Sequence, residues 1–218
     1  MARMPRLVVP QYPHHVTQRG ARRMNTFFSN WDYQYYLDLI ADHKSEAGIE
    51  VWAYCLMPNH VHLVVVPEEK GSLSRLFGRV HRHYTRAINF RQKCTGHLWQ
   101  ERFHSFVMDE RYLLATVRYV ELNPVQAKLC ANAANWRWSS AKAHLTGRDD
   151  QVVTTAPMLE RVADWKSFLS TKDDRDGLIR SHTGSGRPAG DEVFIETLEG
   201  LTGRLLRKKK PGPRAGVR

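Results

Sequence analysis

The stretch Cys55-Leu-Met-Pro-Asn-His-Val-His-Leu-Val-Val-Val66 predicts a strand that leaves a tight turn at Pro58-Asn59. Its run of β-branched residues favours extended backbone, in which residues i and i+2 point to the same face of a sheet. His60 and His62 are therefore expected side by side. Imidazole is a good metal ligand, so the pair is a candidate metal site. Taken alone, two histidines on a half-exposed strand are more often plain polar surface.

The segments around this strand alternate between strand and helix patterns. Residues 49–57 are rich in strand formers, so with the turn and the histidine strand they predict a hairpin. The full pattern predicts, in chain order, a strand at 14–19, a helix at 33–47, the hairpin, a helix at 72–89, a strand at 98–108 and a helix at 110–120. This β-α-β-β-α-β-α order predicts an α+β fold, a ferredoxin-like split βαβ antiparallel sheet with one added helix.

Beyond this core we expect two smaller parts. Residues 1–147 form the main domain, residues 148–183 a loop and helix extension, and residues 184–218 a helical, basic C-terminal extension. The run Gly184-Ser-Gly-Arg-Pro-Ala-Gly190 predicts a flexible joint. Asp191 then begins an amphipathic helix, whose apolar stripe must be buried against another surface. The stripe consists of Phe194, Leu198, Leu201 and Leu205.

The charge distribution indicates a polyanionic partner. The formal net charge is +11, and no acidic residue precedes Asp32, whereas five arginines do. On the helix predicted at 72–89, four arginines share one face, where they repel one another unless a polyanion lies near. They are Arg75, Arg79, Arg82 and Arg86. The distribution favours nucleic acid, and the alternative is an ordinary solvated basic surface.

Other sequence features limit the location of the protein. The longest apolar run, Leu63 to Val66, is too short to span a membrane, and no apolar segment follows the basic N-terminus. The three cysteines, Cys55, Cys94 and Cys130, are widely spaced and include no Cys-x-x-Cys pair. We therefore expect a cytoplasmic, nucleoid-associated protein without a membrane partner.

Tyr119 and Asn123 are four residues apart near the end of a predicted helix, so they share one face. A tyrosine hydroxyl can attack phosphorus, and an amide oxygen suits a hard cation. By themselves these residues are typical of a packed helix. Pro124 disfavours helical geometry at Asn123, and a kink there would weaken the assignment.

In combination these motifs resemble a known family. Met57-Pro-Asn-His-Val-His-Leu-Val-Val65 resembles the HUH signature of single-tyrosine transposases of the IS200/IS605 type. Further segments resemble the REP-associated branch of that family, in order over nearly the whole chain. They are His15-Val-Thr-Gln-Arg-Gly20, Leu98-Trp-Gln-Glu-Arg-Phe103, Tyr119-Val-Glu-Leu-Asn-Pro-Val125, Trp138-Ser-Ser140 and Gly186-Arg-Pro-Ala-Gly-Asp191.

The resemblance implies a role for each matching residue. His60, His62 and Asn123 would bind a divalent ion, Mg²⁺ or Mn²⁺, and Tyr119 would be the nucleophile. Attack on single-stranded hairpin DNA would leave a 5′-phosphotyrosine link and a free 3′-hydroxyl, and reversal would rejoin strands. Residues 1–147 would be the catalytic domain. The expected DNA contacts are Arg19, Arg22, Arg23, Arg79, Arg82, Arg86, Arg102, Arg187, Lys208 and Lys209.

Two other functions compete with this hypothesis. One is a non-catalytic DNA- or RNA-binding protein, which explains the charge but leaves the histidines and Tyr119 as coincidences. The other is a metal-dependent hydrolase that uses water, for which no His-Glu-x-x-His or carboxylate-rich motif exists. The protein is either a monomer or a homodimer. The segment from 191 onward either docks over the catalytic face or is a disordered basic tail that only adds non-specific binding.

Overall fold

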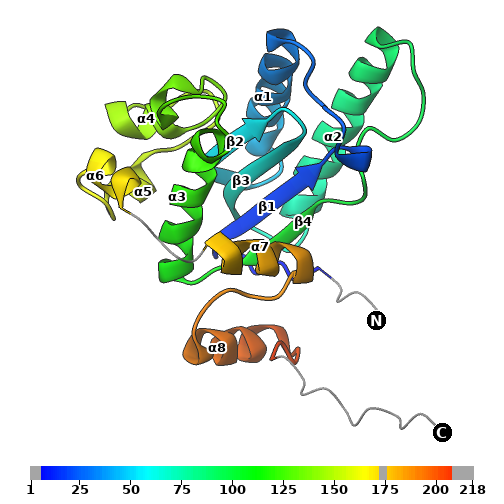
Figure 1. Cartoon of the computed structure of the whole chain (residues 1–218). Coiled ribbons are helices and arrows are strands. Elements are labelled where there is room, and N and C mark those ends of the chain that lie inside the picture. Colours follow the sequence, from blue (N-terminus) through cyan, green and yellow to red (C-terminus); the bar gives the residue numbers. More distant parts are fainter. Residues whose placement is uncertain (1–5, 172–175, 208–218) are drawn as a thin grey trace, which may run out of the picture.

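The computed structural model describes residues 6–171 and 176–207, which form a central antiparallel sheet with helices on both faces (Figure 1). The strands are β1 (His14–Arg19), β2 (Ile49–Met57), β3 (His60–Pro67) and β4 (His104–Val107). Their spatial order is β2-β3-β1-β4, with every neighbouring pair antiparallel. This is the α+β, ferredoxin-like arrangement predicted from the sequence, which is therefore confirmed.

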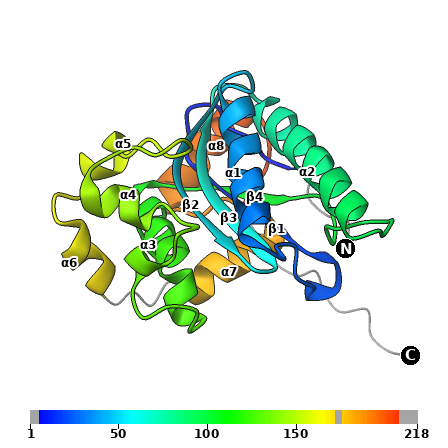
Figure 2. The ribbon, with the colours of Figure 1, turned by 90° about the horizontal axis from the view of Figure 1, so that it is seen from above.

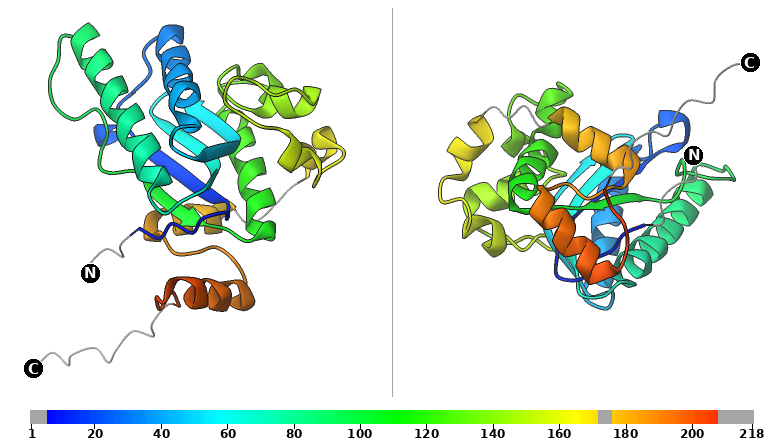
Figure 3. Two further views of the ribbon diagram at one scale, coloured as in Figure 1. Left: turned by 180° about the vertical axis from the view of Figure 1, so that it is seen from behind. Right: turned by 90° about the horizontal axis from the view of Figure 1, so that it is seen from below.

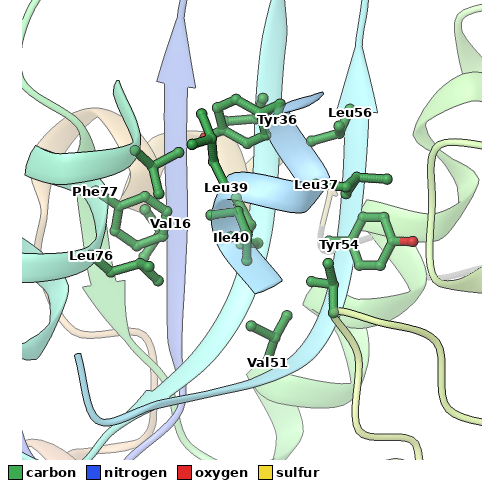
Figure 4. Close-up of a cluster of buried hydrophobic side chains, with 14 of the residues drawn as sticks. Val16, Tyr36, Leu37, Leu39, Ile40, Val51, Tyr54, Leu56, Leu76 and Phe77 are labelled. Atoms are coloured by element: carbon green, nitrogen blue, oxygen red, sulfur yellow. The ribbon is translucent and has the colours of Figure 1, made fainter. Parts of the chain in front are cut away.

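Three long helices cover the two faces of the sheet. Helices α1 (Asn30–Lys44) and α2 (Ser72–Arg91) lie on one face, and α3 (Glu110–Gln126) lies on the other (Figure 2). Strand alternation sorts the apolar side chains between the two layers. Figure 4 shows side chains from the sheet, α1 and α2 in the first layer, including Val16, Tyr36, Ile40 and Phe77. The second layer joins other strand residues, such as Val64, to α3.

Several element boundaries differ from the predicted ones. Helix α1 begins three residues before the predicted start because Ser29 caps it, and Asp32 completes a capping box with Ser29. Strand β4 is shorter than the predicted 98–108. Residues before it form a loop in which Trp99 bridges Gly20, and Gln100 N donates to Arg19 O at 2.9 Å. This loop therefore lies beside the end of β1.

The C-terminal part consists of short helices around the sheet (Figure 3). The 3₁₀ turns are η1 (Ala21–Arg23), which follows β1, and η2 (Ala133–Asn135), which precedes α4 (Ala141–Thr146). The extension expected at 148–183 contains two short helices, α5 (Ala156–Leu159) and α6 (Trp165–Ser170). They are followed by α7 (Asp176–Ser185) and α8 (Glu192–Thr202).

The segment expected as a flexible joint, 184–190, is paired with the core. Its first two residues end α7, so the predicted boundary between residues 183 and 184 falls inside a helix. Ala189 then forms a parallel bridge with Met108, beside β4. Ala189 N donates to Val107 O, and Asp109 N donates to Ala189 O, both at 2.9 Å.

Helix α8 has the N-cap expected from the sequence, because the Asp191 side chain accepts from Phe194 N. Its apolar stripe is only partly buried. Leu198 is fully buried against Leu7, Val9 and Val107, whereas Leu201 and Leu205 are exposed. The prediction that the whole stripe is buried is therefore wrong for its C-terminal half. The expected tail residues Lys208 and Lys209 lie outside the described residues. Within the described part, none of the helices has the length and apolar character needed to cross a membrane.

Candidate active site

The two histidines of the HUH motif stand on the sheet face that α3 covers. His62 is 5% exposed, and His60, at the first position of β3, is half-buried. Their rings lie 4.9 Å apart between centroids, nearly perpendicular to each other. Because β3 is a central strand, the pair is fixed by ladder hydrogen bonds to both β1 and β2.

Each imidazole has a partner at Nδ1. His60 Nδ1 lies 2.6 Å from Asn59 Oδ1, and His62 Nδ1 lies 2.9 Å from His15 Nε2. When Nδ1 carries the proton, as Asn59 Oδ1 requires for His60, Nε2 keeps a free lone pair. Burial lowers the pKa of His60 to about 4 and the pKa of His62 well below its usual value, and Arg19 adds to both shifts. Both rings are therefore neutral near pH 7.

Helix α3 brings Tyr119 and Asn123 to these histidines. The Tyr119 ring meets the His62 ring edge-on, with 5.6 Å between centroids. Asn123 Nδ2 lies 3.5 Å from His62 Nε2. The helix runs through Pro124 to Gln126, and Ala127 N donates to Asn123 O at 2.9 Å. Asn123 thus keeps the helical register with Tyr119, and the kink considered at Pro124 is not found.

The two histidines and Tyr119 open into a pocket of about 410 Å³, whose lining does not include Asn123. His60, His62 and Tyr119 line it together with residues from β1, the turn after β1, the 100–104 segment and α7. The lining residues that sequence analysis expected as DNA contacts are Arg19 and Arg23. The residues that it missed are Thr17, Gln18, Gln100, Glu101, His104, Arg180, Thr183 and Gly184.

The missed residues share one property. Each approaches the histidines through tertiary packing from a segment distant in sequence, so its place in the pocket cannot be predicted from local periodicity, even for Gln100 and Glu101, which lie in the Leu98–Phe103 motif. His15 had no predicted role beyond its place in the motif His15-Val-Thr-Gln-Arg-Gly20. Its contact with His62 depends on the pairing of β1 with β3. Arg180 lies on a helix whose position the sequence did not predict.

The donor set at the histidines fits a divalent ion. The Asn123 amide lies 3.5 Å from His62 Nε2, and its oxygen can replace its nitrogen after a half-turn of the side chain. Among the described residues, no group of three or more His, Cys, Asp and Glu side chains could hold a metal. The fit therefore rests on two imidazoles and one amide, a set that suits Mn²⁺ better than Mg²⁺.

A second, larger cavity of about 850 Å³ lies between α2 and the 97–103 loop. Three of the expected DNA contacts line it, namely Arg82, Arg86 and Arg102. This placement is consistent with DNA in the cavity. Gln18, Gln100 and Glu101 line both this cavity and the histidine pocket. The two hollows are therefore adjacent along the 100–101 segment.

The other expected DNA contacts lie elsewhere. Arg79 differs from Arg82 and Arg86 in two ways. Its guanidinium forms an ion pair with Glu46, and it does not line the cavity. Arg22 is exposed beside the pocket, in a left-handed backbone conformation. The Arg187 guanidinium donates to Leu206 O at 2.7 Å and so ties the end of α8 to the preceding segment.

A comparison with known families and structures agrees with this architecture. The family described as "Transposase IS200 like" matches residues 8–123, more than half of the chain. The chain therefore belongs to the IS200-like transposase family, and the resemblance found in the sequence is confirmed. Its general role is that of a DNA-processing transposase.

Two solved structures are similar to this chain. One is a REP-associated tyrosine transposase bound to a REP hairpin, with a TM-score of 0.58, 19% identity, and coverage of 71% of this chain and 92% of that one. The other is a putative transposase from Deinococcus radiodurans R1, with a TM-score of 0.40, 19% identity, and coverage of 55% and 96%. No curated protein matched the sequence. At this identity the first structure supports the fold.

Proposed function

We propose that this chain is a metal-dependent single-stranded DNA endonuclease and strand transferase in which Tyr119 is the nucleophile. The observation that carries the proposal is the edge-on contact between Tyr119 and His62 inside a pocket lined by arginines. A phosphodiester is the substrate that such a pocket suits, because arginine recognises phosphate oxygens and a phenol oxygen can attack phosphorus.

In the proposed reaction, Tyr119 Oη forms a bond to the scissile phosphorus and the bond from phosphorus to the 3′ oxygen breaks. The phenol loses its proton, and the departing 3′ oxygen gains one. The products are a 5′-phosphotyrosine and a free 3′-hydroxyl. Attack by another 3′-hydroxyl reverses the exchange and joins strands, so one phosphate ester replaces another and no energy-rich cofactor is required.

His60, His62 and Asn123 would hold a divalent ion, Mn²⁺ or Mg²⁺. When bound, such an ion polarises a phosphate oxygen and neutralises developing charge. The chain itself supplies the orientation, because His15 and Asn59 fix the two imidazole rings and α3 fixes the phenol. Burial of Tyr119, which is 7% exposed, restricts its approach to the pocket side.

The proposed substrate is hairpin DNA with an adjoining single strand. The REP-associated relative is bound to a REP hairpin, which favours the same kind of ligand here. The α2 cavity, with Arg82, Arg86 and Arg102, adjoins the pocket and offers a path for the DNA backbone. The same cavity would also serve a non-catalytic DNA- or RNA-binding protein, so binding alone does not distinguish the two functions.

Formation of a covalent adduct does distinguish them. The wild-type protein, incubated with labelled hairpin oligonucleotides and Mn²⁺, should give a protein–DNA adduct on a denaturing gel. Tyr119→Phe should bind the DNA equally well and give none, whereas Tyr112→Phe, on the same helix but outside the pocket, should behave as wild type. An adduct at wild-type level in Tyr119→Phe contradicts the assignment. Release of free 5′-phosphate by that variant would instead favour a hydrolase that uses water.

Chelation tests the metal. EDTA, His60→Ala and His62→Ala should each abolish adduct formation while hairpin binding remains, and Mn²⁺ should restore the chelated wild type. His83→Ala removes an exposed histidine on α2 and is the matched control. Full cleavage in chelator would refute the metal requirement.

A further inference from the structure

Helix α7 contributes a wall of the candidate active site that lies beyond the family match. That match ends at residue 123, whereas Arg180, Thr183 and Gly184 of α7 line the same pocket as His60, His62 and Tyr119. The Arg180 guanidinium carbon lies 5.8 Å from the centre of the Tyr119 ring. A cation thus stands directly beside the proposed nucleophile.

The position of α7 is fixed by the apolar face next to the one that lines the pocket. Ile179 is fully buried in the apolar layer that also contains Tyr119 and Phe106. The His182 ring packs on Phe106 and Tyr112, with centroids 5.7 and 5.4 Å away. Residues 179 and 182 share a face, and residues 180 and 184 share the next one. Burial of the first face therefore presents the second to the pocket.

The pocket has an excess of positive charge without internal compensation. Arg19, Arg23 and Arg180 line it, and within residues 6–171 and 176–207 none of their guanidinium groups forms an ion pair or hydrogen bond. The one carboxylate in the lining, Glu101, is paired with His104 at 2.7 Å. Three unpaired guanidinium groups around one pocket repel one another unless an anion lies between them.

We propose that Arg180 is a phosphate-binding residue, which holds the phosphate that Tyr119 attacks and the same phosphate after the strand is cut. The inference rests on the proposed function, because it takes the pocket to be the site of the scissile phosphate. Arginine suits this role because it stays protonated and presents parallel N–H donors that match two phosphate oxygens. In this position it opposes the negative charge that develops on phosphate oxygens during the exchange.

The first test measures binding and needs neither metal nor cleavage. Single-stranded oligonucleotides of one sequence, with either a 5′-phosphate or a 5′-hydroxyl, are titrated in EDTA by fluorescence anisotropy. Wild type should prefer the 5′-phosphate by about tenfold, and Arg180→Gln should lose most of that preference. Arg180→Lys should keep part of it. Lys166→Gln, which removes one exposed charge on α6 outside the pocket, should keep all of it. A preference unchanged in Arg180→Gln, or absent in wild type, overturns the proposal.

The second test measures the chemical step. In single-turnover experiments with Mn²⁺ and saturating hairpin DNA, Arg180→Gln should form adduct about 10² times more slowly than wild type, with hairpin affinity within about twofold. An unchanged rate would contradict the role of Arg180 in the reaction. Tyr119→Phe separates this proposal from the proposed function. This variant should keep the 5′-phosphate preference. If it also formed an adduct, Tyr119 would not be the nucleophile, but the phosphate-binding role of Arg180 would be unaffected.

Discussion

His15 Nε2 lies 2.9 Å from His62 Nδ1, and the two rings stack with 5.1 Å between their centroids. For His62 Nε2 to bind a cation, Nδ1 must carry the proton and donate to His15. His15 is itself 1% exposed, and burial lowers its pKa to about 3, so near pH 7 it is neutral. With its own proton on Nδ1, its Nε2 accepts from His62 Nδ1, and the contact holds the direction of the His62 ring.

We predict that His15→Leu weakens Mn²⁺ binding by about 10- to 100-fold, because it removes the partner that orients His62. His15→Gln retains a side-chain acceptor and should restore part of the affinity. Electron paramagnetic resonance titration of Mn²⁺ gives the dissociation constant, and circular dichroism checks that each variant folds. Wild-type affinity in a folded His15→Leu would show that β3 orients His62 without help.

The arginines on α2 should differ in their contribution to DNA binding. Arg82 and Arg86 line the large cavity, and their guanidinium groups form no ion pair within the described residues, whereas Arg79 is paired with Glu46. Replacing Arg82 or Arg86 with Gln should reduce the slope of log affinity against log salt by about one each. Arg79→Gln is the matched control and should change the slope little. Equal effects of all three substitutions would mean that DNA contacts the whole helix face.

Glu121 should be among the least replaceable residues of the fold. It is fully buried on α3, where its carboxylate accepts from Ser140 Oγ and His144 Nδ1, each at 2.6 Å, and from Trp165 Nε1 at 2.8 Å. Glu121→Ala leaves the buried His144 and Trp165 donors without a partner and Ser140 Oγ with only Tyr54 O at 3.3 Å. It should lower the free energy of unfolding by about 3 kcal/mol or more.

Urea denaturation measures the loss. The control, Glu110→Gln, removes an exposed carboxylate on the same helix that pairs with Arg161, and should cost about 1 kcal/mol or less. Similar losses in the two variants would mean that water enters the Glu121 site and satisfies the donors.

The stability of the protein should fall below about pH 6.5 partly through His14. This residue is fully buried, its Nδ1–H donates to Tyr12 O at 2.8 Å, and its Nε2 accepts from Val9 N at 3.2 Å. Burial lowers its pKa from 6.5 to about 4, against the opposing effect of the Tyr12 bond. The unfolded chain therefore binds more protons between these values, and this contribution to stability is present above pH 6.5 and is lost as the pH falls toward 4.

One such group adds up to about 1.4 kcal/mol per pH unit to the slope of unfolding free energy. His14→Gln should therefore have a shallower slope than wild type when urea denaturation is compared at about pH 7 and about pH 5. Burial also lowers the pKa of other histidines, such as His15 and His81, so the unfolding free energy of the variant should still depend on pH. Parallel slopes for the two proteins would contradict the buried neutral state of His14.

The sequence predicted the features that depend on local periodicity. Strand alternation placed His60 and His62 on one face, and the order of strand and helix patterns was sufficient for the ferredoxin-like sheet. The roles of the histidines, Tyr119 and Asn123 remain predictions. Proline lacks an N–H and disfavours helical geometry in the residue before it, so the sequence suggested a kink at Pro124. Helix α3 nevertheless continues to Gln126, because the packing of its buried face against the sheet offsets the one missing hydrogen bond.

Features that depend on tertiary contacts were not accessible from the sequence. Helical spacing puts Arg79 and Arg82 on one face, but cannot show that Glu46, on another element, neutralises only the first. The C-terminal segment was expected either to dock over the catalytic face or to be a basic tail. In the structure, α7 lines the pocket, and α8 packs against Leu7, Val9 and Val107 without contributing to the pocket lining.

The pairing of Ala189 with the strand beside it also bears on self-association. Strand β4 is an outer strand of the sheet, and Ala189 pairs with its last carbonyl, at Val107, and with the N–H of Asp109 just beyond its end. Gly186 lies close to the Ser105 carbonyl of the same strand. An outer strand with free N–H and C=O groups is a template on which a second chain can add its own strand. The segment from Gly186 to Ala189 therefore occupies part of the edge that a second chain would need. Two copies can join their sheets through β4 only after this segment is displaced.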